Sequence, residues 1–173
     1  MGYYARWMDR WERHLASRDS DRVVRPFEWG ADWLDRLEFP RFRFGGDNAS
    51  KLAAFVEEAL RDSDRFFAYE TPGDYKLQGN HLMFRSPVHS GYPENDIVHA
   101  LWMPAPRDRG RALVVLPQWN SGPDGHVGLC KLLNRFGISA LRMTMAYHAE
   151  RKPKETARAD YHVSSNIGRT IHA

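Results

Sequence analysis

Eight histidines and one cysteine, Cys130, are the side chains most suited to binding a metal ion or moving a proton. A helical zinc site needs two histidines four residues apart around a glutamate, and a thiolate site needs paired cysteines; the sequence has neither pattern. His81, His89 and His99 lie on or near expected strands, but three ligands must converge in a geometry that spacing does not predict. We therefore expect no metal site and no cofactor.

A serine nucleophile is the second chemistry to consider. Such a serine is displayed by a Gly-x-Ser-x-Gly turn between a strand and a helix, where the tight turn exposes its hydroxyl. The nearest match, Gly137-Ile138-Ser139-Ala140-Leu141, lacks the final glycine, and Ser139 falls within an expected strand. Ser164 and Ser165 have no glycines at the required spacing. We identify no catalytic residue in this chain.

The elements that could position reactive groups are clearest after Arg111. Residues 112–116 are a short apolar run rich in β-branched side chains, which is typical of a strand buried on both faces. An apolar stripe from Val127 to Phe136 indicates a helix that ends at Gly137, and residues 138–143 indicate a second strand. This order predicts a right-handed βαβ unit with parallel strands.

Two earlier regions have different periods. Apolar residues alternate between positions 75 and 84 around the turn signal Gln78-Gly79-Asn80, and residues 97–102 form another extended run. These patterns predict antiparallel strands, some of them paired as a hairpin. Nearer the N-terminus, aromatic residues between Tyr4 and Leu15 recur at helical spacing. We expect this aromatic face to cover a neighbouring core, and a docking surface is the alternative.

Two further helices are expected. One begins near Asn48 or Ser50, either of which can act as its N-cap, and continues with an apolar stripe to Leu60. The other begins near Ser164 and has no stop signal before the last residue, Ala173. The sheet therefore looks unfinished, because about five strands with helices on both faces would need more chain.

Composition and charge restrict the class of protein. The 173 residues are 42% hydrophobic and 27% charged, which is typical of a chain that buries a core. No apolar run approaches the roughly 18 residues of a membrane span, and no apolar stretch near the N-terminus resembles a secretory signal. One cysteine excludes an internal disulfide and suits a reducing compartment, so we expect a cytoplasmic protein.

The net charge of +3 does not by itself indicate nucleic acid. Lys and Arg exceed Asp and Glu only from Arg111 onward, and charges of both signs are interleaved, so we expect no nucleic-acid partner. The densest basic run is Arg151-Lys152-Pro153-Lys154. We expect it to be a solvated loop, with docking of an anion as the alternative.

Two segments resemble the opening of the α/β-hydrolase fold. The first is the strand and polar loop Leu113-Val114-Val115-Leu116-Pro117-Gln118-Trp119-Asn120-Ser121. The second runs from Leu132 to Arg142 and continues with Tyr147-His148-Ala149-Glu150-Arg151-Lys152-Pro153, which is similar to an abhydrolase group with a Tyr-x-x-x-Arg-Lys-Pro loop. The resemblance covers residues 111–173 well and residues 75–103 only by strand pattern.

The resemblance implies hydrolysis of an ester or related acyl bond by a serine nucleophile, a histidine base and a carboxylate. Such a reaction develops negative charge on a carbonyl oxygen, which fixed backbone N–H groups stabilise. In this fold one donor lies in the loop after the third strand and the other follows the nucleophile. That position makes the N–H of Trp119 the first oxyanion-loop candidate and that of Gln118 the second. Asn120 and His148 would line the pocket.

A structural alternative remains open for the same loop: Trp119 only packs, and residues 120–122 only form a turn. The expected fold class is α/β, with an incomplete α/β-hydrolase-type sheet in which antiparallel strands lead into a parallel βαβ unit. We place an aromatic-rich helical extension at residues 1–70 and the N-terminal half of the hydrolase-like domain at residues 71–173. The triad would then lie beyond Ala173, and this polypeptide would be inactive alone.

The expected partners follow from these two hypotheses. The complete hydrolase would bind a small-molecule acyl substrate, and its uncovered sheet edge would favour self-association of this fragment. The alternative function is a non-catalytic interaction module that binds a partner through the tryptophan-rich N-terminal helices. An evolved module should be monodisperse and melt cooperatively, whereas half a core should bind hydrophobic dye or aggregate.

Overall fold

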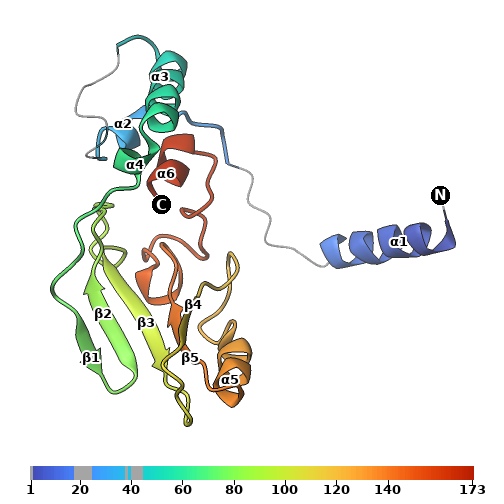
Figure 1. The fold of residues 1–173 in the computed structure, drawn as a ribbon. Coiled ribbons are helices and arrows are strands. Elements are labelled where there is room, and N and C mark those ends of the chain that lie inside the picture. Colours follow the sequence, from blue (N-terminus) through green and yellow to red (C-terminus); the bar gives the residue numbers. More distant parts are fainter. Residues whose placement is uncertain (1, 18–24, 38, 40–44) are drawn as a thin grey trace.

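The computed structural model describes residues 2–17, 25–37, 39 and 45–173 (Figure 1). Its centre is an open sheet with the spatial order β1-β2-β3-β5-β4. The strands are β1 (Lys76–Gln78), β2 (His81–Arg85), β3 (Ile97–Met103), β4 (Ala112–Val115) and β5 (Ser139–Met143). Neighbours from β1 to β5 pair antiparallel, whereas β4 and β5 are parallel. The sheet is therefore mixed, and the chain has an α/β fold.

The predicted hairpin is formed by β1 and β2. Gln78 pairs with His81 across the turn, and Gly79 has a φ of +59°, which glycine adopts without steric cost. Every residue of β2 then pairs with a residue of β3. The period-two pattern of residues 75–84 and 97–102 is thus confirmed as antiparallel pairing.

The predicted βαβ unit is also confirmed. Helix α5 (Val127–Arg135) connects β4 to β5, and Ala112 pairs with Ser139 at the start of the parallel ladder. Gly137 follows the helix with a φ of +72°, as predicted for a C-terminal glycine. A Cβ atom there would lie 2.7 Å from the Arg107 carbonyl oxygen, so the chain also passes too close for a side chain.

The expectation that β4 is buried on both faces is wrong. Leu113 and Val114 are 48% and 59% exposed, and Val115 is the buried residue of this strand. The reason is its position, because β4 lies at the edge of the described sheet with β5 as its neighbour. Helix α5 likewise packs Cys130 inward but leaves Leu132 exposed. The apolar residues of β4 and α5 therefore form an exposed apolar surface along an edge strand.

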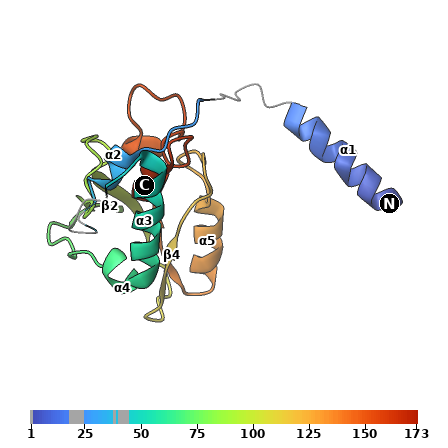
Figure 2. The same ribbon diagram turned by 90° about the horizontal axis from the view of Figure 1, so that it is seen from above.

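The helices are α1 (Tyr3–Ser17), α2 (Ala31–Leu34), α3 (Asn48–Arg61), α4 (Ser63–Phe66), the 3-10 helix η1 (Ala149–Arg151) and α6 (Ile167–His172). Helices α2, α3, α4 and α6 gather at one end of the sheet (Figures 1 and 2). Their core contains Phe39 and Phe55 from the N-terminal part together with Ile167 and Ile171 from α6. Residues on both sides of the expected boundary at residue 70 therefore share one core.

Helices α3 and α6 each begin at a residue whose side chain caps the helix. Asp47 is the N-cap of α3, since its carboxylate accepts a hydrogen bond from the Ser50 N–H at 2.8 Å. The Ser50 side chain and this backbone bond together lower the pKa of Asp47. The expectation that Asn48 or Ser50 caps this helix is therefore wrong by one to three residues. Helix α6 begins after Asn166, whose side chain accepts from the Arg169 N–H.

Helix α1 stands away from the sheet and from the other helices in both views (Figures 1 and 2). Its aromatic face is exposed: Trp7 is 46% and Trp11 50% accessible to solvent. The centroids of their two rings lie 5.6 Å apart. The expectation that this face covers a neighbouring core is wrong for the described residues. The docking alternative is the one consistent with this exposure.

Candidate functional site

Two loops meet where the parallel strands end. Because β4 and β5 are parallel, their carboxyl ends lie at the same edge of the sheet, which is where open α/β sheets bind ligands. The first loop, residues 116–126, follows β4, and the second, residues 144–166, follows β5. Between them these loops contain all four predicted site residues, namely Gln118, Trp119, Asn120 and His148.

His148 joins the two loops. Its Nε2 accepts a hydrogen bond from the Asn120 backbone N–H at 2.8 Å, and its Nδ1 lies 2.8 Å from the Ala146 carbonyl oxygen. These partners require a neutral ring whose proton is on Nδ1 and is donated to Ala146. The side chain is 3% exposed, and burial lowers the pKa of His148. Both ring nitrogens are occupied, so His148 positions the first loop from within the protein.

Trp119 and Asn120 are held to the second loop through the backbone of Ala159. The Trp119 indole Nε1 donates to the Ala159 carbonyl at 3.2 Å, and the Ala159 N–H donates to Asn120 Oδ1 at 3.4 Å. Asn120 has a φ of +56°, in the left-handed region that asparagine adopts more readily than most residues. The loop turns at residues 118–121 rather than at the expected residues 120–122, since the Ser121 N–H donates to the Gln118 carbonyl at 3.1 Å.

The backbone N–H groups of Gln118 and Trp119 are not used as hydrogen-bond donors within the described fold. Neither has a hydrogen-bond acceptor among the described residues, whereas the next N–H, that of Asn120, is bound to His148. Both residues are exposed at the surface of the loop. Unengaged N–H groups on a loop that tertiary hydrogen bonds hold in place can donate to an anionic oxygen without reorganisation.

A cavity of about 470 Å³ lies beside this loop, and we call it the smaller cavity. Its wall combines an indole ring with charged and hydroxyl side chains, namely Trp119, Arg25, Arg158, Asp160, Ser164 and Ser165. The Asp160 carboxylate accepts from Arg158 Nε at 2.6 Å and from Arg25 Nη2 at 3.1 Å. The guanidinium carbon of Arg158 lies 5.5 Å from the Trp119 ring centroid. Two guanidinium groups thus share one carboxylate next to an aromatic wall.

The buried guanidinium of Arg151 connects the second loop to the backbone of Asn95 and Thr144. Its guanidinium donates to the Asn95 carbonyl from Nε at 3.0 Å and from Nη2 at 2.7 Å, and to the Thr144 carbonyl from Nη1 at 3.1 Å. Asn95 Oδ1 in turn accepts from the Tyr147 N–H at 2.8 Å. Burial lowers the pKa of Arg151 to about 10, so the group is still charged at neutral pH. The expectation of a solvated loop is therefore wrong for Arg151.

The histidines considered as metal ligands do not converge. His99 Nδ1 lies 3.2 Å from His81 Nε2, whereas His89 lies 3.5 Å from a carboxylate oxygen of Asp96. Within the described part of the chain, no three His, Cys, Asp or Glu side chains gather as metal ligands. Burial and the neighbouring His81 lower the pKa of His99.

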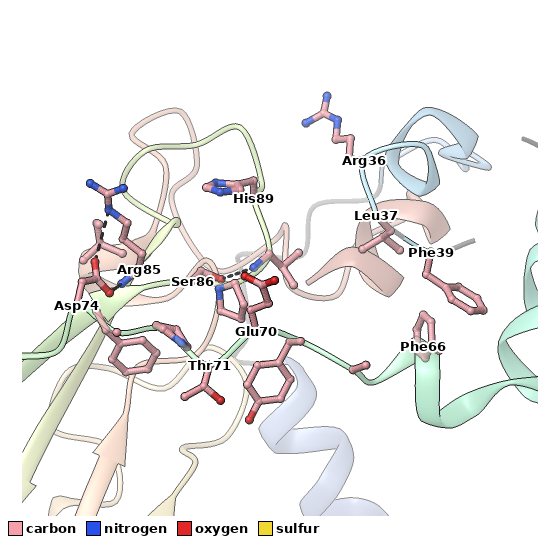
Figure 3. A pocket seen from close by; sticks show the side chains of 18 of the residues that line it. Arg36, Leu37, Phe39, Phe66, Glu70, Thr71, Asp74, Arg85, Ser86 and His89 are labelled. Carbon is pink, nitrogen blue, oxygen red and sulfur yellow. Dashed lines mark hydrogen bonds and ion pairs between the residues drawn. The ribbon is translucent and has the colours of Figure 1, made fainter. Parts of the chain in front are cut away.

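A larger cavity of about 1690 Å³ lies between the helical layer and the hairpin (Figure 3). On one side it is lined by Phe39 and Phe66, whose ring centroids lie 5.5 Å apart. On the other side Arg85 Nε lies 3.5 Å from a carboxylate oxygen of Asp74. None of the predicted site residues lines it. The smaller cavity, which Trp119 lines, is therefore the better candidate site.

Four participants in this site were missed by sequence reasoning, namely Arg25, Asn95, Arg158 and Asp160. Arg25 and Asp160 meet across 135 residues, and no local pattern connects them. Asn95 lies in the connection before β3 and has no motif around it. The one usable signal was the spacing of Tyr147 and Arg151, which contact Asn95 together.

Comparisons with known proteins do not assign this chain to a family. The sequence matches no protein-family model, and a search of curated proteins finds no significant relative. Among the described residues, none of the helices combines the length and apolar composition that crossing a bilayer requires.

Proposed function

We propose that this chain forms the oxyanion-loop half of a serine α/β-hydrolase that cleaves an ester or a related acyl bond. The observation that carries the proposal is the loop after β4, where the N–H groups of Gln118 and Trp119 have no acceptor among the described residues. The loop lies at the carboxyl end of a parallel strand and is held by His148 and Ala159. These features suit donors aimed at the oxygen of an acyl-transfer transition state.

The serines near the site support the view that the nucleophile comes from elsewhere. Ser139 is buried in β5, and its Oγ accepts a hydrogen bond from the Ala105 N–H at 3.0 Å. Ser164 Oγ donates to the Asn166 carbonyl at 3.0 Å. A hydroxyl bound in this way is not presented to a substrate by a strained turn. The chain is therefore expected to be inactive alone.

The edge of the sheet supports the same view. β4 has one strand neighbour in the described sheet, and its Leu113 and Val114 are about half exposed. An exposed apolar edge strand is an aggregation hazard that proteins normally cover. In the proposal, further polypeptide pairs with β4 and brings the nucleophile, the acid and the catalytic histidine.

The first test is the coding DNA downstream of codon 173. A reading frame with Gly-x-Ser-x-Gly between a predicted strand and helix supports the proposal, and no such motif in any frame contradicts it. The longer protein should hydrolyse p-nitrophenyl butyrate, and replacing the motif serine by alanine should abolish this activity.

A variant of the longer protein tests the oxyanion loop itself. Trp119→Pro removes the backbone N–H and should lower kcat by roughly 10²-fold to 10³-fold, the usual loss for one oxyanion donor. Trp119→Phe keeps the N–H and removes only the indole, so most of kcat should remain. Equal losses in both variants would show that the side chain matters and the N–H does not.

A second candidate function is an interaction module, and the exposure of α1 favours it. Tyr4, Trp7 and Trp11 form a continuous aromatic face on a helix that stands apart from the fold. In this case the isolated chain should be monodisperse, melt cooperatively and bind little hydrophobic dye apart from α1. Strong dye binding that persists after Trp7→Ala and Trp11→Ala substitution would instead point to the β4 edge.

A further inference from the structure

We propose that α1 is an interfacial helix that binds the surface of a lipid bilayer containing anionic headgroups, with its aromatic face turned toward the acyl chains. The observation that carries the proposal is the row of rings formed by Tyr4, Trp7 and Trp11 on a helix that stands apart from the fold (Figures 1 and 2). This interaction is separate from the proposed hydrolysis, because α1 shares no residue with the candidate site.

The apolar side chains of α1 gather on one side of the helix. Because successive residues are rotated by about 100°, the apolar positions fall within an arc of about 100°. The side chains in this arc are those of Tyr4, Trp7, Met8, Trp11 and Leu15. The charged side chains lie outside the arc, and they are those of Arg6, Asp9, Arg10, Glu12 and Arg13. The helix is therefore amphipathic along its whole length.

The aromatic face is open to solvent at both ends and in the middle. Tyr4 is 71% exposed and Leu15 is 46% exposed, and the two tryptophans between them are about half exposed. The ring centroids of Tyr4 and Trp7 lie 6.1 Å apart, so the rings form one continuous surface rather than isolated contacts. A continuous apolar surface of this kind marks an interaction site.

The residue types on this face favour a bilayer as the partner. The large side chains are mainly indole and phenol rings, which combine an apolar body with a polar N–H or O–H group. Such rings concentrate at the level of the headgroups, where one end is in water and the other in hydrocarbon. The Nε1 groups of Trp7 and Trp11 have no acceptor among the described residues, so both can donate to lipid oxygens.

The charge of α1 complements anionic headgroups. The helix contains three arginines against two acidic residues, so positive charge exceeds negative charge by one. Arg13 pairs with Asp9 at 3.1 Å within the helix, which leaves Arg6 and Arg10 as the remaining cations and Glu12 as the remaining anion. The long arginine side chains can reach headgroup phosphates from the polar side, and their N–H donors match phosphate oxygens.

The length of α1 fits an orientation parallel to the bilayer surface. Its 15 residues are fewer than the roughly 20 that cross the hydrocarbon core, and charged residues interrupt the apolar ones. An amphipathic helix of this kind lies in the plane of the interface and buries only its apolar face. The proposed interaction therefore anchors the chain to a membrane surface without spanning the membrane.

Vesicle flotation with the purified full chain tests the proposal. Vesicles of phosphatidylcholine and phosphatidylglycerol in a three-to-one ratio should carry the chain upward in a density gradient. Vesicles of pure phosphatidylcholine should bind it roughly fivefold more weakly, which is the effect of about one net positive charge. Salt at about 0.5 M should remove most of this difference but leave binding, because ions screen charges and not aromatic burial.

Two sets of variants locate the binding face. Trp7→Ala should weaken binding to the mixed vesicles at least roughly fivefold, because an indole ring is removed from the interface. Trp29→Ala is the matched control, since Trp29 is 38% exposed but belongs to the folded body, and it should leave binding unchanged.

The second set exchanges neighbours by combining Arg6→Trp with Trp7→Arg and Arg10→Trp with Trp11→Arg. It keeps the composition and net charge of α1 but divides the aromatic face, so flotation should be lost. Thermal melts should be the same for all variants except Trp29→Ala, because α1 stands apart from the core.

Three results would overturn the proposal: no flotation of the unaltered chain, equal binding to both kinds of vesicle at low salt, or full binding by the exchanged variant. A chain that ignores vesicles but self-associates through Trp7 and Trp11 would assign the face to a second copy instead. These results do not bear on the hydrolase hypothesis. The absence of a downstream nucleophile motif would refute the hydrolase and leave vesicle binding intact.

Discussion

His148 illustrates how a histidine near a candidate active site can have a purely positioning role. A catalytic base needs a ring nitrogen within reach of the substrate, but both nitrogens of His148 are bonded to backbone groups. The residue lies between the loop that presents Trp119 and the chain that follows β5. Its role in the fold is to hold the conformation of that loop.

Substitution His148→Leu should therefore destabilise the protein by about 2–3 kcal/mol, because the Ala146 carbonyl and the Asn120 N–H lose their partner. Urea unfolding measures the change. His89→Leu is the matched control, since His89 is exposed and should change stability by less than about 0.5 kcal/mol. Similar losses for both variants would contradict a positioning role for His148.

Among the elements, α6 depends on a close backbone approach between Gly168 and Gly30. A Cβ atom on Gly168 would overlap the Gly30 carbonyl oxygen, so α6 contacts the segment before α2 directly through the backbone. Asn166 caps α6 and also binds Glu28, which ties the same two segments together. This contact joins the N-terminal segment that carries Arg25 to the rest of the site.

Gly168→Ala should thus cost about 2–3 kcal/mol of unfolding free energy, because the backbones must separate to admit the methyl group. Gly128→Ala is the matched control. Gly128 lies in α5 with nothing within 4 Å of a Cβ atom, so alanine there should stabilise the helix by about 0.5 kcal/mol. Calorimetric melts of both variants should move in opposite directions, and a neutral Gly168→Ala would contradict the close approach.

For the molecule as a whole, four enclosed histidines make stability depend on pH. Burial is the main cause that lowers the pKa of His99, His148, His162 and His172. Below pH 6.5 the unfolded chain therefore binds protons that the folded chain does not, and stability falls as pH falls. The stabilising contribution is complete above pH 6.5, the ordinary histidine pKa.

Urea midpoints measured from pH 7.5 down to pH 5 should therefore decrease, most steeply below pH 6.5. Each histidine adds at most about 1.4 kcal/mol per pH unit to the slope. The carboxylates of Asp47 and Asp96, whose pKa values are lowered, lose their contribution only below about pH 4, outside this window. A midpoint that stays constant from pH 7.5 to 5 would show that the histidines are solvated.

The elements with local signals were predictable, and those without were not. Alternation around Gln78-Gly79-Asn80 predicted the hairpin, and the apolar run, stripe and glycine between residues 112 and 143 predicted the βαβ unit. The exposure of β4 was not predictable, because an apolar run has the same sequence whether or not a further strand covers it. The position of α1 was missed for the same reason, since a periodic face says nothing about what it contacts.

In the candidate site, the sequence alone predicted where the loop after β4 lies. The strand, the loop and the helix follow from short-range periodicity and from the backbone preferences of glycine and asparagine. The contacts that shape the site were not predicted. Asn120 with His148, Arg25 with Asp160 and Asn95 with Arg151 are pairs separated by 28 to 135 residues. Such pairs form only when the sheet and the helical layer are assembled, because packing and long-range hydrogen bonds select one partner among many that are chemically equivalent.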